Sequence, residues 1–206
     1  MNRKRLLLGS ILGIVAVVAV GLTFVAAEQS RAQELVRQSQ DEQLAARFIE
    51  EYNGRLDEAK TLTKMAEATW NTAMGYYGVG AYADAITQFE RAQSEYIQAT
   101  EKYRQASAVN RVLIETEFAK RSPKLATYLE IRSLWVDAQV ERHLAMFESG
   151  EQMEVALRSF VNGDYKLYEQ ALNKTNEKIV LHDQWVHIAN TLLSKMRALN
   201  VEVTGA

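Results

Sequence analysis

The stretch GAYADAITQFERAQSEYIQATEKYRQA, residues 80–106, repeats small and aromatic residues with a seven-residue period. The repeated alanines are Ala85, Ala92, Ala99 and Ala106. The repeated aromatics are Tyr82, Phe89, Tyr96 and Tyr103. Spacings that alternate between three and four residues place all of these side chains along one seam of an α-helix. The stretch therefore predicts a long helix that packs along this seam.

A second seam with the same period precedes the first one. Its members are Leu56, Ala59, Thr63, Ala66, Trp70, Ala73 and Tyr77. Only the turn sequence Gly78-Val79-Gly80 separates the two seams, so we expect an antiparallel hairpin with left-handed coiled-coil geometry. Alanine at every seventh position lets the two backbones approach closely, while the large residues cover the edges. This surface is predicted to serve chiefly the packing of the protein itself.

The remaining chain also has helical periodicity, with one proline and ten glycines in 206 residues. Possible breaks lie at Asn53-Gly54, Gly78-Val79-Gly80, Ser122-Pro123, Ser149-Gly150 and Asn162-Gly163. The stronger breaks give four segments, at about 28–77, 81–121, 123–161 and 164–199. Segments of similar length predict an all-α fold, an elongated up-down bundle of antiparallel hairpins. Gly54 and Gly150 are then either kinks or divisions into five or six shorter helices.

The N-terminus predicts a membrane anchor. Arg3, Lys4 and Arg5 precede an uncharged run over residues 6–27, which as a helix spans about 33 Å. The basic cluster stays in the cytoplasm, so the chain after it is exported. We expect a stub and transmembrane helix over 1–27, an extracytoplasmic helical domain over 28–199 and a tail over 200–206.

A cleaved signal peptide is the competing interpretation of the N-terminus. Val25 and Ala27 are small enough for a cleavage site, but the apolar run exceeds the about 7–15 residues usual for a signal-peptide core. The expected location is the cytoplasmic membrane, with a single pass, the N-terminus inside and the helical domain outside.

Composition excludes several classes of function. The chain has no cysteine, which rules out disulfides, thiolate metal sites and a cysteine nucleophile. Without the three N-terminal basic residues, 21 basic side chains face 26 acidic ones, a net charge of −5 for the exported part. Nucleic acid is therefore not an expected partner, because binding it requires a concentrated basic face.

The search for catalytic or metal-binding residues gives no candidate. His182 and His187 are five residues apart and point about 140° from each other on a helix, so they do not converge on one ion. His143 stands alone, and no histidine has a glutamate three residues before it, as carboxylate-bridged metal centres require. Phosphate-binding loops, a nucleophile elbow and H-E-x-x-H are also absent. We expect neither an enzyme nor a cofactor-binding or metal-binding protein.

Residues 80–92, GAYADAITQFERA, resemble the second half of a tetratricopeptide repeat. The matching small and aromatic residues are Gly80, Tyr82, Ala85, Phe89 and Ala92, with Tyr76 at the aromatic position of the first helix. The resemblance covers about residues 66–99, with a weaker echo in NGDYKLYEQAL, residues 162–172. A repeat array should show a turn glycine again near residue 114, where Ile114 stands instead. The resemblance implies a helical partner-binding module.

The sequence predicts a non-enzymatic scaffold or accessory subunit that acts through protein–protein contacts. Both turns, 78–80 and 162–163, should lie at the end of the bundle far from the membrane. The candidate contacts at this end are Tyr76, Tyr77, Val79, Tyr82, Phe160 and Tyr165. The apolar flank 179–193, with Trp185, is the second candidate surface, although the centre of the bundle is the simpler place for this tryptophan.

Expected partners are other, membrane-associated protein subunits and the lipid bilayer through residues 6–27, and the sequence is also compatible with a homo-oligomer. An exported sensor or small-ligand-binding bundle is the alternative function.

Overall fold

The computed structural model describes the backbone of residues 3–199 and the side chains of residues 28–199. Its elements are α1 (Arg3–Gly78), α2 (Tyr82–Ile114), α3 (Glu117–Lys120), α4 (Pro123–Val161) and α5 (Tyr165–Leu199). No strand occurs within this part of the chain, so the predicted all-α bundle is confirmed. The chain divides into two units, Met1–Leu44 and Ala45–Ala206.

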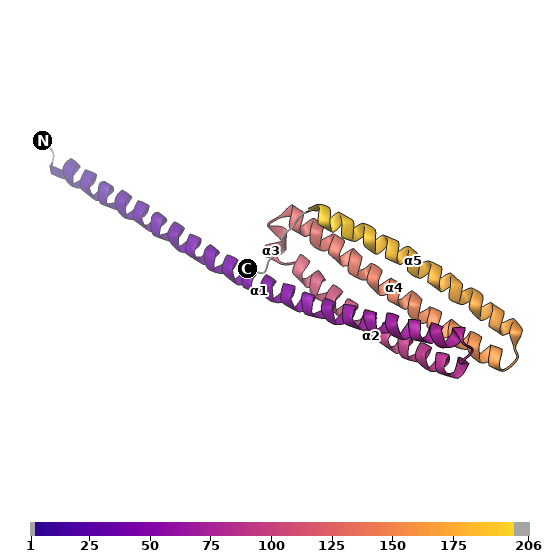
Figure 1. The fold of residues 1–206 in the computed structure, drawn as a ribbon. Helices are drawn as coiled ribbons and strands as arrows, with labels where there is room; N and C mark the ends of the chain where they lie inside the picture. Colours follow the sequence, from indigo (N-terminus) through magenta and orange to yellow (C-terminus); the bar gives the residue numbers. More distant parts are fainter. Residues whose placement is uncertain (1–2, 200–206) are drawn as a thin grey trace. The chain divides into compact units, whose positions relative to one another are not determined.

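The bundle is formed by the second unit. Consecutive long helices run antiparallel, and α4 lies between α2 and α5 (Figure 1). The part of α1 from Ala45 onward packs against α2 and α4 in every layer of the core. In the first unit, most of the described side chains of residues 28–44 are exposed. Among the described side chains, the hydrophobic core therefore lies in the bundle.

The alanine seam of the first hairpin is confirmed. The fully buried alanines are Ala59, Ala66 and Ala73 on α1, and Ala85, Ala92, Ala99 and Ala106 on α2. Phe89, Tyr96 and Tyr103 are buried beside them, and Trp70 meets Phe89 edge to face with ring centroids 4.9 Å apart. Each large buried ring contributes roughly 2 kcal/mol through apolar area, so these rings stabilise the hairpin.

The turns that the sequence predicts are present, and glycine makes two of them possible. Gly80 has φ 76° and Gly163 has φ 78°, a backbone region that only glycine adopts without strain. The Ser122 hydroxyl accepts a hydrogen bond from the Leu125 amide at 3.3 Å, and Pro123 occupies the first helical position of α4. These three breaks define the hairpins.

Gly54 and Gly150 do not interrupt their helices, so neither glycine divides its segment into shorter helices. Glycine costs about 1 kcal/mol within a helix, less than the packing of the turns on either side contributes. At Gly150 a side chain would meet Gln93: a Cβ atom there would lie 2.7 Å from Gln93 Cγ. This glycine lets α2 and α4 approach closely.

One predicted segment is wrong in extent. The segment 81–121 ends as a helix at Ile114, and α3 follows after a short turn. Thr116 caps α3, because its hydroxyl accepts a hydrogen bond from the Ala119 amide at 3.3 Å. In addition, α2 alone has 33 residues, whereas a tetratricopeptide repeat fits two helices and a turn into about 34 residues. The resemblance therefore does not extend beyond the turn region.

Among the residues that the structure describes, no helix combines the length and apolarity needed to cross a membrane. The predicted span at 6–27 and the orienting residues Arg3, Lys4 and Arg5 lie outside the residues whose side chains are described. The predicted tail 200–206 also lies outside them.

Candidate functional site

Four of the five aromatic residues predicted at one end of the bundle come together, and the fifth, Tyr76, is exposed. The ring centroids of Tyr77 and Tyr82 are 6.3 Å apart, and those of Tyr82 and Phe160 are 5.1 Å apart. Phe160 in turn lies 5.9 Å from Tyr165 and 5.2 Å from Tyr168. The contacts between Tyr82 and Phe160 place both turns at the same end, as predicted. We call these five rings the aromatic end cluster.

Sequence reasoning missed Tyr168 as a site residue, although Tyr165 and Tyr168 are three residues apart and so share a helix face. The Asp164 carboxylate caps α5 by accepting a hydrogen bond from the Leu167 amide at 3.0 Å, which fixes the first turn that carries both tyrosines. The Tyr77 and Tyr168 hydroxyls are 3.2 Å apart. This hydrogen bond, with burial as the lesser cause, raises the pKa of Tyr168 to about 12. The Tyr168 ring is therefore neutral at physiological pH, and its hydroxyl is held by Tyr77.

Beside the cluster, several apolar side chains remain in solvent. Val79 is 79% exposed, Tyr165 63% and Val161 62%, and Tyr76 is exposed as well. We call these four residues the tip surface. Tyr77, Tyr82 and Phe160 are half-buried and support it from below. Val161 was not predicted, because a valine that ends a helix gives no signal of its exposure.

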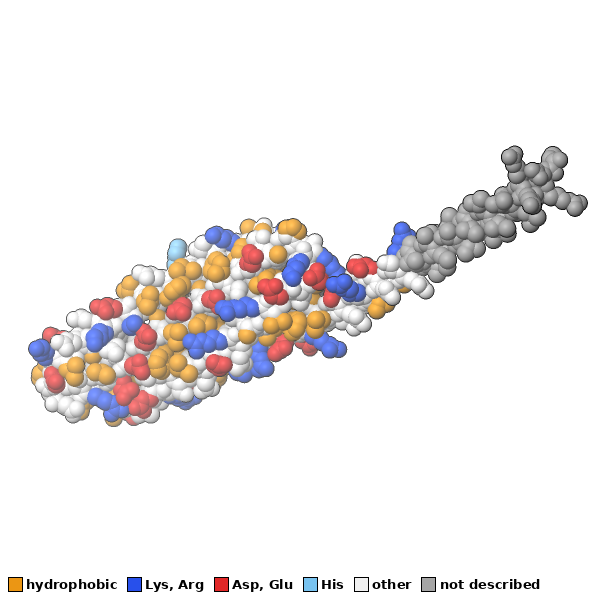
Figure 2. All heavy atoms as spheres, turned by 180° about the vertical axis from the view of Figure 1, so that it is seen from behind, with side chains coloured by type: hydrophobic (Ala, Val, Ile, Leu, Met, Phe, Trp, Pro, Cys, Tyr) orange, Lys and Arg blue, Asp and Glu red, His pale blue; other side chains and the backbone are white. Residues whose placement is uncertain are grey.

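Trp185 is not brought to the tip surface. It is half-buried on α5, twenty residues beyond Tyr165, which corresponds to about 30 Å along a helix. Around it, Val180, Leu181 and Ile188 are exposed, so the predicted apolar flank of α5 does face solvent. Trp185 itself packs at the edge of the bundle. Figure 2 shows one face of the described residues, on which apolar patches alternate with charged side chains of both signs.

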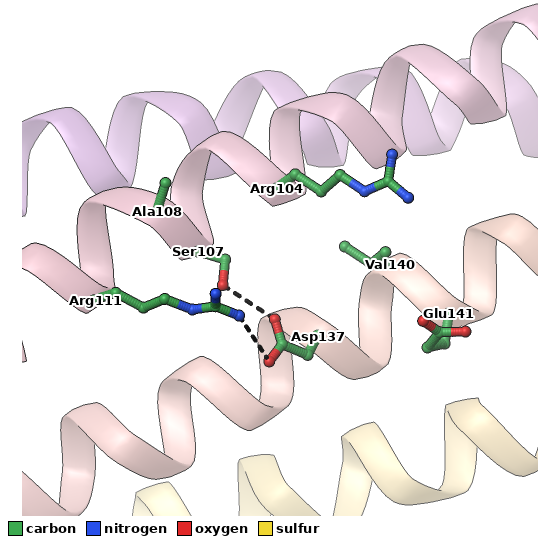
Figure 3. A pocket seen from close by; sticks show the side chains of 7 residues that line it. All are labelled: Arg104, Ser107, Ala108, Arg111, Asp137, Val140 and Glu141. Carbon is green, nitrogen blue, oxygen red and sulfur yellow. Dashed lines mark hydrogen bonds and ion pairs between the residues drawn. The ribbon is translucent and has the colours of Figure 1, made fainter.

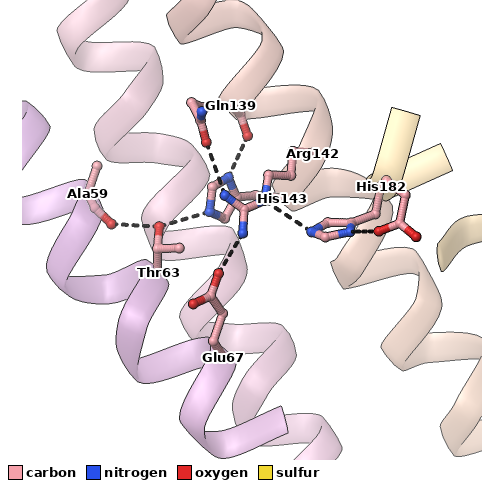
Figure 4. A network of polar contacts seen from close by, with 8 residues as sticks. Ala59, Thr63, Glu67, Gln139, Arg142, His143 and His182 are labelled. Carbon is pink, nitrogen blue, oxygen red and sulfur yellow. Dashed lines mark hydrogen bonds and ion pairs between the residues drawn. The ribbon is translucent and has the colours of Figure 1, made fainter. Parts of the chain in front are cut away.

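A buried polar network links α1, α4 and α5 at mid-bundle (Figure 4). The His143 Nε2 atom lies 2.8 Å from the Thr63 hydroxyl, and its Nδ1 atom contacts the Gln139 carbonyl. A carbonyl only accepts hydrogen bonds, so Nδ1 carries a proton and, in the neutral ring, Nε2 is an acceptor. The single Thr63 hydroxyl proton is then shared between His143 Nε2 and the Ala59 carbonyl, which lies 2.9 Å from the hydroxyl oxygen. Burial is the main cause that lowers the pKa of His143 to about 4, so this ring is neutral at pH 7.

The neighbouring Arg142 connects three helices. Its Nη2 atom donates to Glu67 Oε1 at 2.5 Å, and its Nε atom donates to His182 Nε2 at 3.0 Å. His182 Nδ1 then donates to Asp183 Oδ1, also at 3.0 Å. Burial lowers the pKa of His182. Every ring nitrogen of the network has a partner, so the network holds α1, α4 and α5 together.

The network also has no arrangement for a metal ion. Within the described side chains, no group of three or more histidine, aspartate or glutamate residues is placed to hold a metal. His187 is exposed on α5, away from the contacts of His182. The two histidines diverge, as their spacing predicts.

A groove of about 440 Å³ lies between α2 and α4 (Figure 3). Asp137 occupies its centre: one carboxylate oxygen accepts from Ser107 at 3.0 Å, and the other pairs with Arg111 at 3.6 Å. The lining contains two arginines, Arg104 and Arg111, and two acids, Asp137 and Glu141. This balance of charge gives no basis for selecting a charged ligand.

Comparison of the chain with protein-family models, curated proteins and solved structures gave no match.

Proposed function

We propose that this chain is a membrane-anchored, non-enzymatic scaffold or accessory subunit that binds a partner protein through the tip surface. The carrying observation is the exposure of Val79, Val161 and Tyr165 beside the aromatic end cluster. Apolar and aromatic side chains on a preorganised support are typical of the centre of protein–protein interfaces. The tip surface is preorganised because the rings below it are packed and its two glycine turns have fixed geometry.

The anchor is the second element of the proposal. The basic residues Arg3, Lys4 and Arg5 followed by the uncharged run 6–27 support a single span with the bundle outside the cytoplasm. Alkaline extraction of membranes and the intact mass of the mature protein test it. Retention in the pellet with an uncleaved N-terminus is expected. Recovery of a soluble protein that begins near Glu28 would show that residues 1–27 are a cleaved signal peptide and not an anchor.

The partner-binding element is tested by mild solubilisation and quantitative identification of co-purifying proteins. A variant with Val79→Asp and Tyr165→Asp places two charges in the tip surface, and we expect it to lose its principal partner by about tenfold or more. Val112→Asp on α2 is the control for an exposed valine, since Val112 is 49% exposed and lies at the other end of the helix. A partner that binds the tip variant as well as the wild type contradicts the assignment of the surface.

The apolar flank of α5 provides the competing surface in the same experiment. A variant with Val180→Asp and Ile188→Asp leaves the tip unchanged. We expect this variant to keep the partner. If the α5 variant loses the partner and the tip variant keeps it, the interface lies on α5 and not at the tip surface.

A further inference from the structure

Arg132 is a buried guanidinium in the interior of α4, only 5% exposed. Its Nε atom donates to Asn110 Oδ1 at 2.6 Å, and Asn110 Nδ2 donates to the Leu129 carbonyl at 2.9 Å, which fixes the amide with its oxygen toward the arginine. The guanidinium carbon lies 3.9 Å from the centre of the Tyr52 ring. Two helices thus hold this cation in one position.

No acidic side chain of the described residues forms an ion pair with Arg132, and its Nη2 atom is buried without a hydrogen-bond partner. Burial lowers the pKa of Arg132, while the neighbouring tyrosines Tyr52 and Tyr128 act in the opposite direction. Arginine nevertheless remains protonated in proteins. Buried cations are normally paired, because removing a charge from water without a counter-charge is costly. The counter-charge of Arg132 is missing from the described chain.

The guanidinium lines a cavity of about 350 Å³ between α1, α4 and α5. Apart from the polar Asn53, its uncharged walls are aromatic and aliphatic: Tyr52, Tyr128, Trp135, Leu56, Leu193 and Met196. The only other charged lining residue is Lys60, which is exposed and donates to Asp57 at 3.2 Å. No aspartate or glutamate is part of the lining. The cavity therefore combines a fixed positive charge, apolar walls and a volume within the about 300–1,000 Å³ of small-molecule sites.

We propose that this cavity binds a small organic monocarboxylate with an aromatic or aliphatic body, whose carboxylate pairs with the Arg132 guanidinium at the wall of the cavity. The anion supplies the missing counter-charge, and its apolar body packs against Trp135 and the aliphatic walls. Inorganic phosphate is a poorer match, because it would bury two charges beside one guanidinium and apolar walls. The site is independent of the tip surface, and it gives the alternative function, a small-ligand-binding bundle, a specific location.

The test uses the full chain in nonionic detergent, labelled with 5-fluorotryptophan and titrated with benzoate and with 2-naphthoate. The ¹⁹F signal of Trp135 should shift with saturation at a Kd of about 1 mM or tighter. Trp70 serves as internal control, because it packs in a different layer of the core with Phe89. Benzamide, which has the same shape without charge, should bind at least about tenfold more weakly, as should inorganic phosphate.

Two variants separate the site from general effects. Arg132→Met replaces the charged guanidinium by an apolar, unbranched side chain, and it should weaken benzoate binding by about tenfold or more. Leu193→Phe fills the cavity from α5 and leaves Arg132 in place, and it should also abolish binding, which covers the case in which Arg132→Met fails to fold. Equal binding of benzoate and benzamide, unchanged binding in either folded variant, or an unshifted Trp135 signal would overturn the proposal. A response to phosphate alone would reduce the site to an inorganic anion site.

Discussion

Acidification should destabilise this bundle through His143, and the effect can be isolated. The ring is fully buried between α1, α2 and α4, where Tyr96 and Tyr103 lie 5.8 and 5.1 Å from it. Its pKa falls from 6.5 to about 4, mainly because burial disfavours the charged form. Between these two values the unfolded chain binds a proton that the folded chain does not. The free energy of unfolding therefore decreases as the pH decreases through this window.

The magnitude follows from the pKa difference of about 2.5 units, each worth about 1.36 kcal/mol. The full loss is about 3.4 kcal/mol, and it is complete only below the folded pKa of about 4. Between pH 7 and pH 4.5, about 2.4 kcal/mol of this loss should appear. Above about pH 6.5 the contribution is fully present and no longer changes with pH.

Urea denaturation of the full chain in nonionic detergent, at pH 7 and pH 4.5, measures this effect. Carboxylates also titrate in this range, so the informative quantity is the pH dependence of the wild type minus that of His143→Gln. We expect this difference to be about 2 kcal/mol. His187→Gln is the matched control, since His187 is exposed, and it should behave as the wild type. Equal pH dependence in wild type and His143→Gln, or an NMR titration of His143 near 6.5, would refute the reasoning.

Two further predictions concern the helices. Ala92→Leu should lower the free energy of unfolding by about 1–3 kcal/mol or more, because the seam has no room for added methylenes, while the exposed Ala83→Leu should be nearly neutral in the same urea experiment. Gly54→Ala should raise stability by up to about 1 kcal/mol, since a Cβ there meets nothing within 4 Å, whereas Gly163→Ala should lower it by about 1 kcal/mol because φ is 78°. A stabilised Gly163→Ala would contradict the assigned turn geometry.

The hairpin could be predicted because its signal is local and repeated. Alanine at every seventh residue of two neighbouring segments identifies the face along which the two helices pack. Ser122-Pro123 indicates the start of a helix, because serine is a good N-cap and proline suits the first helical position. The end of α2 at Ile114 was missed because no glycine or proline marks it. Tertiary packing determines where α2 ends: Leu113 and Ala119 are both buried against Ala45 and Ile49 in one cluster, and the chain must turn between them to bury both. Thr116 as an N-cap was the only local signal.

The candidate sites divide in the same way. The aromatic end cluster was predicted because its residues flank two recognisable turns, so their proximity follows from the hairpin topology alone. Arg132 could not be singled out, since its position in the sequence is that of one polar residue in a largely apolar helix. Its burial depends on Tyr52 and Asn110, which are 80 and 22 residues away and come from two other helices. Only the folded bundle shows that no acidic side chain of the described residues forms an ion pair with Arg132.

The buried polar side chains of the bundle occur as separate layers, and these layers differ in how well they are satisfied. Thr69 donates to the buried Glu95 at 2.7 Å, and Arg91 pairs with the same carboxylate at 3.0 Å. In the layer that contains His143, both ring nitrogens have hydrogen-bond partners. These two layers fix the register of the helices without an unpaired charge, which is sufficient for a structural role. The Arg132 layer fixes the same helices but leaves a cation facing a cavity, and structural need alone does not account for that difference.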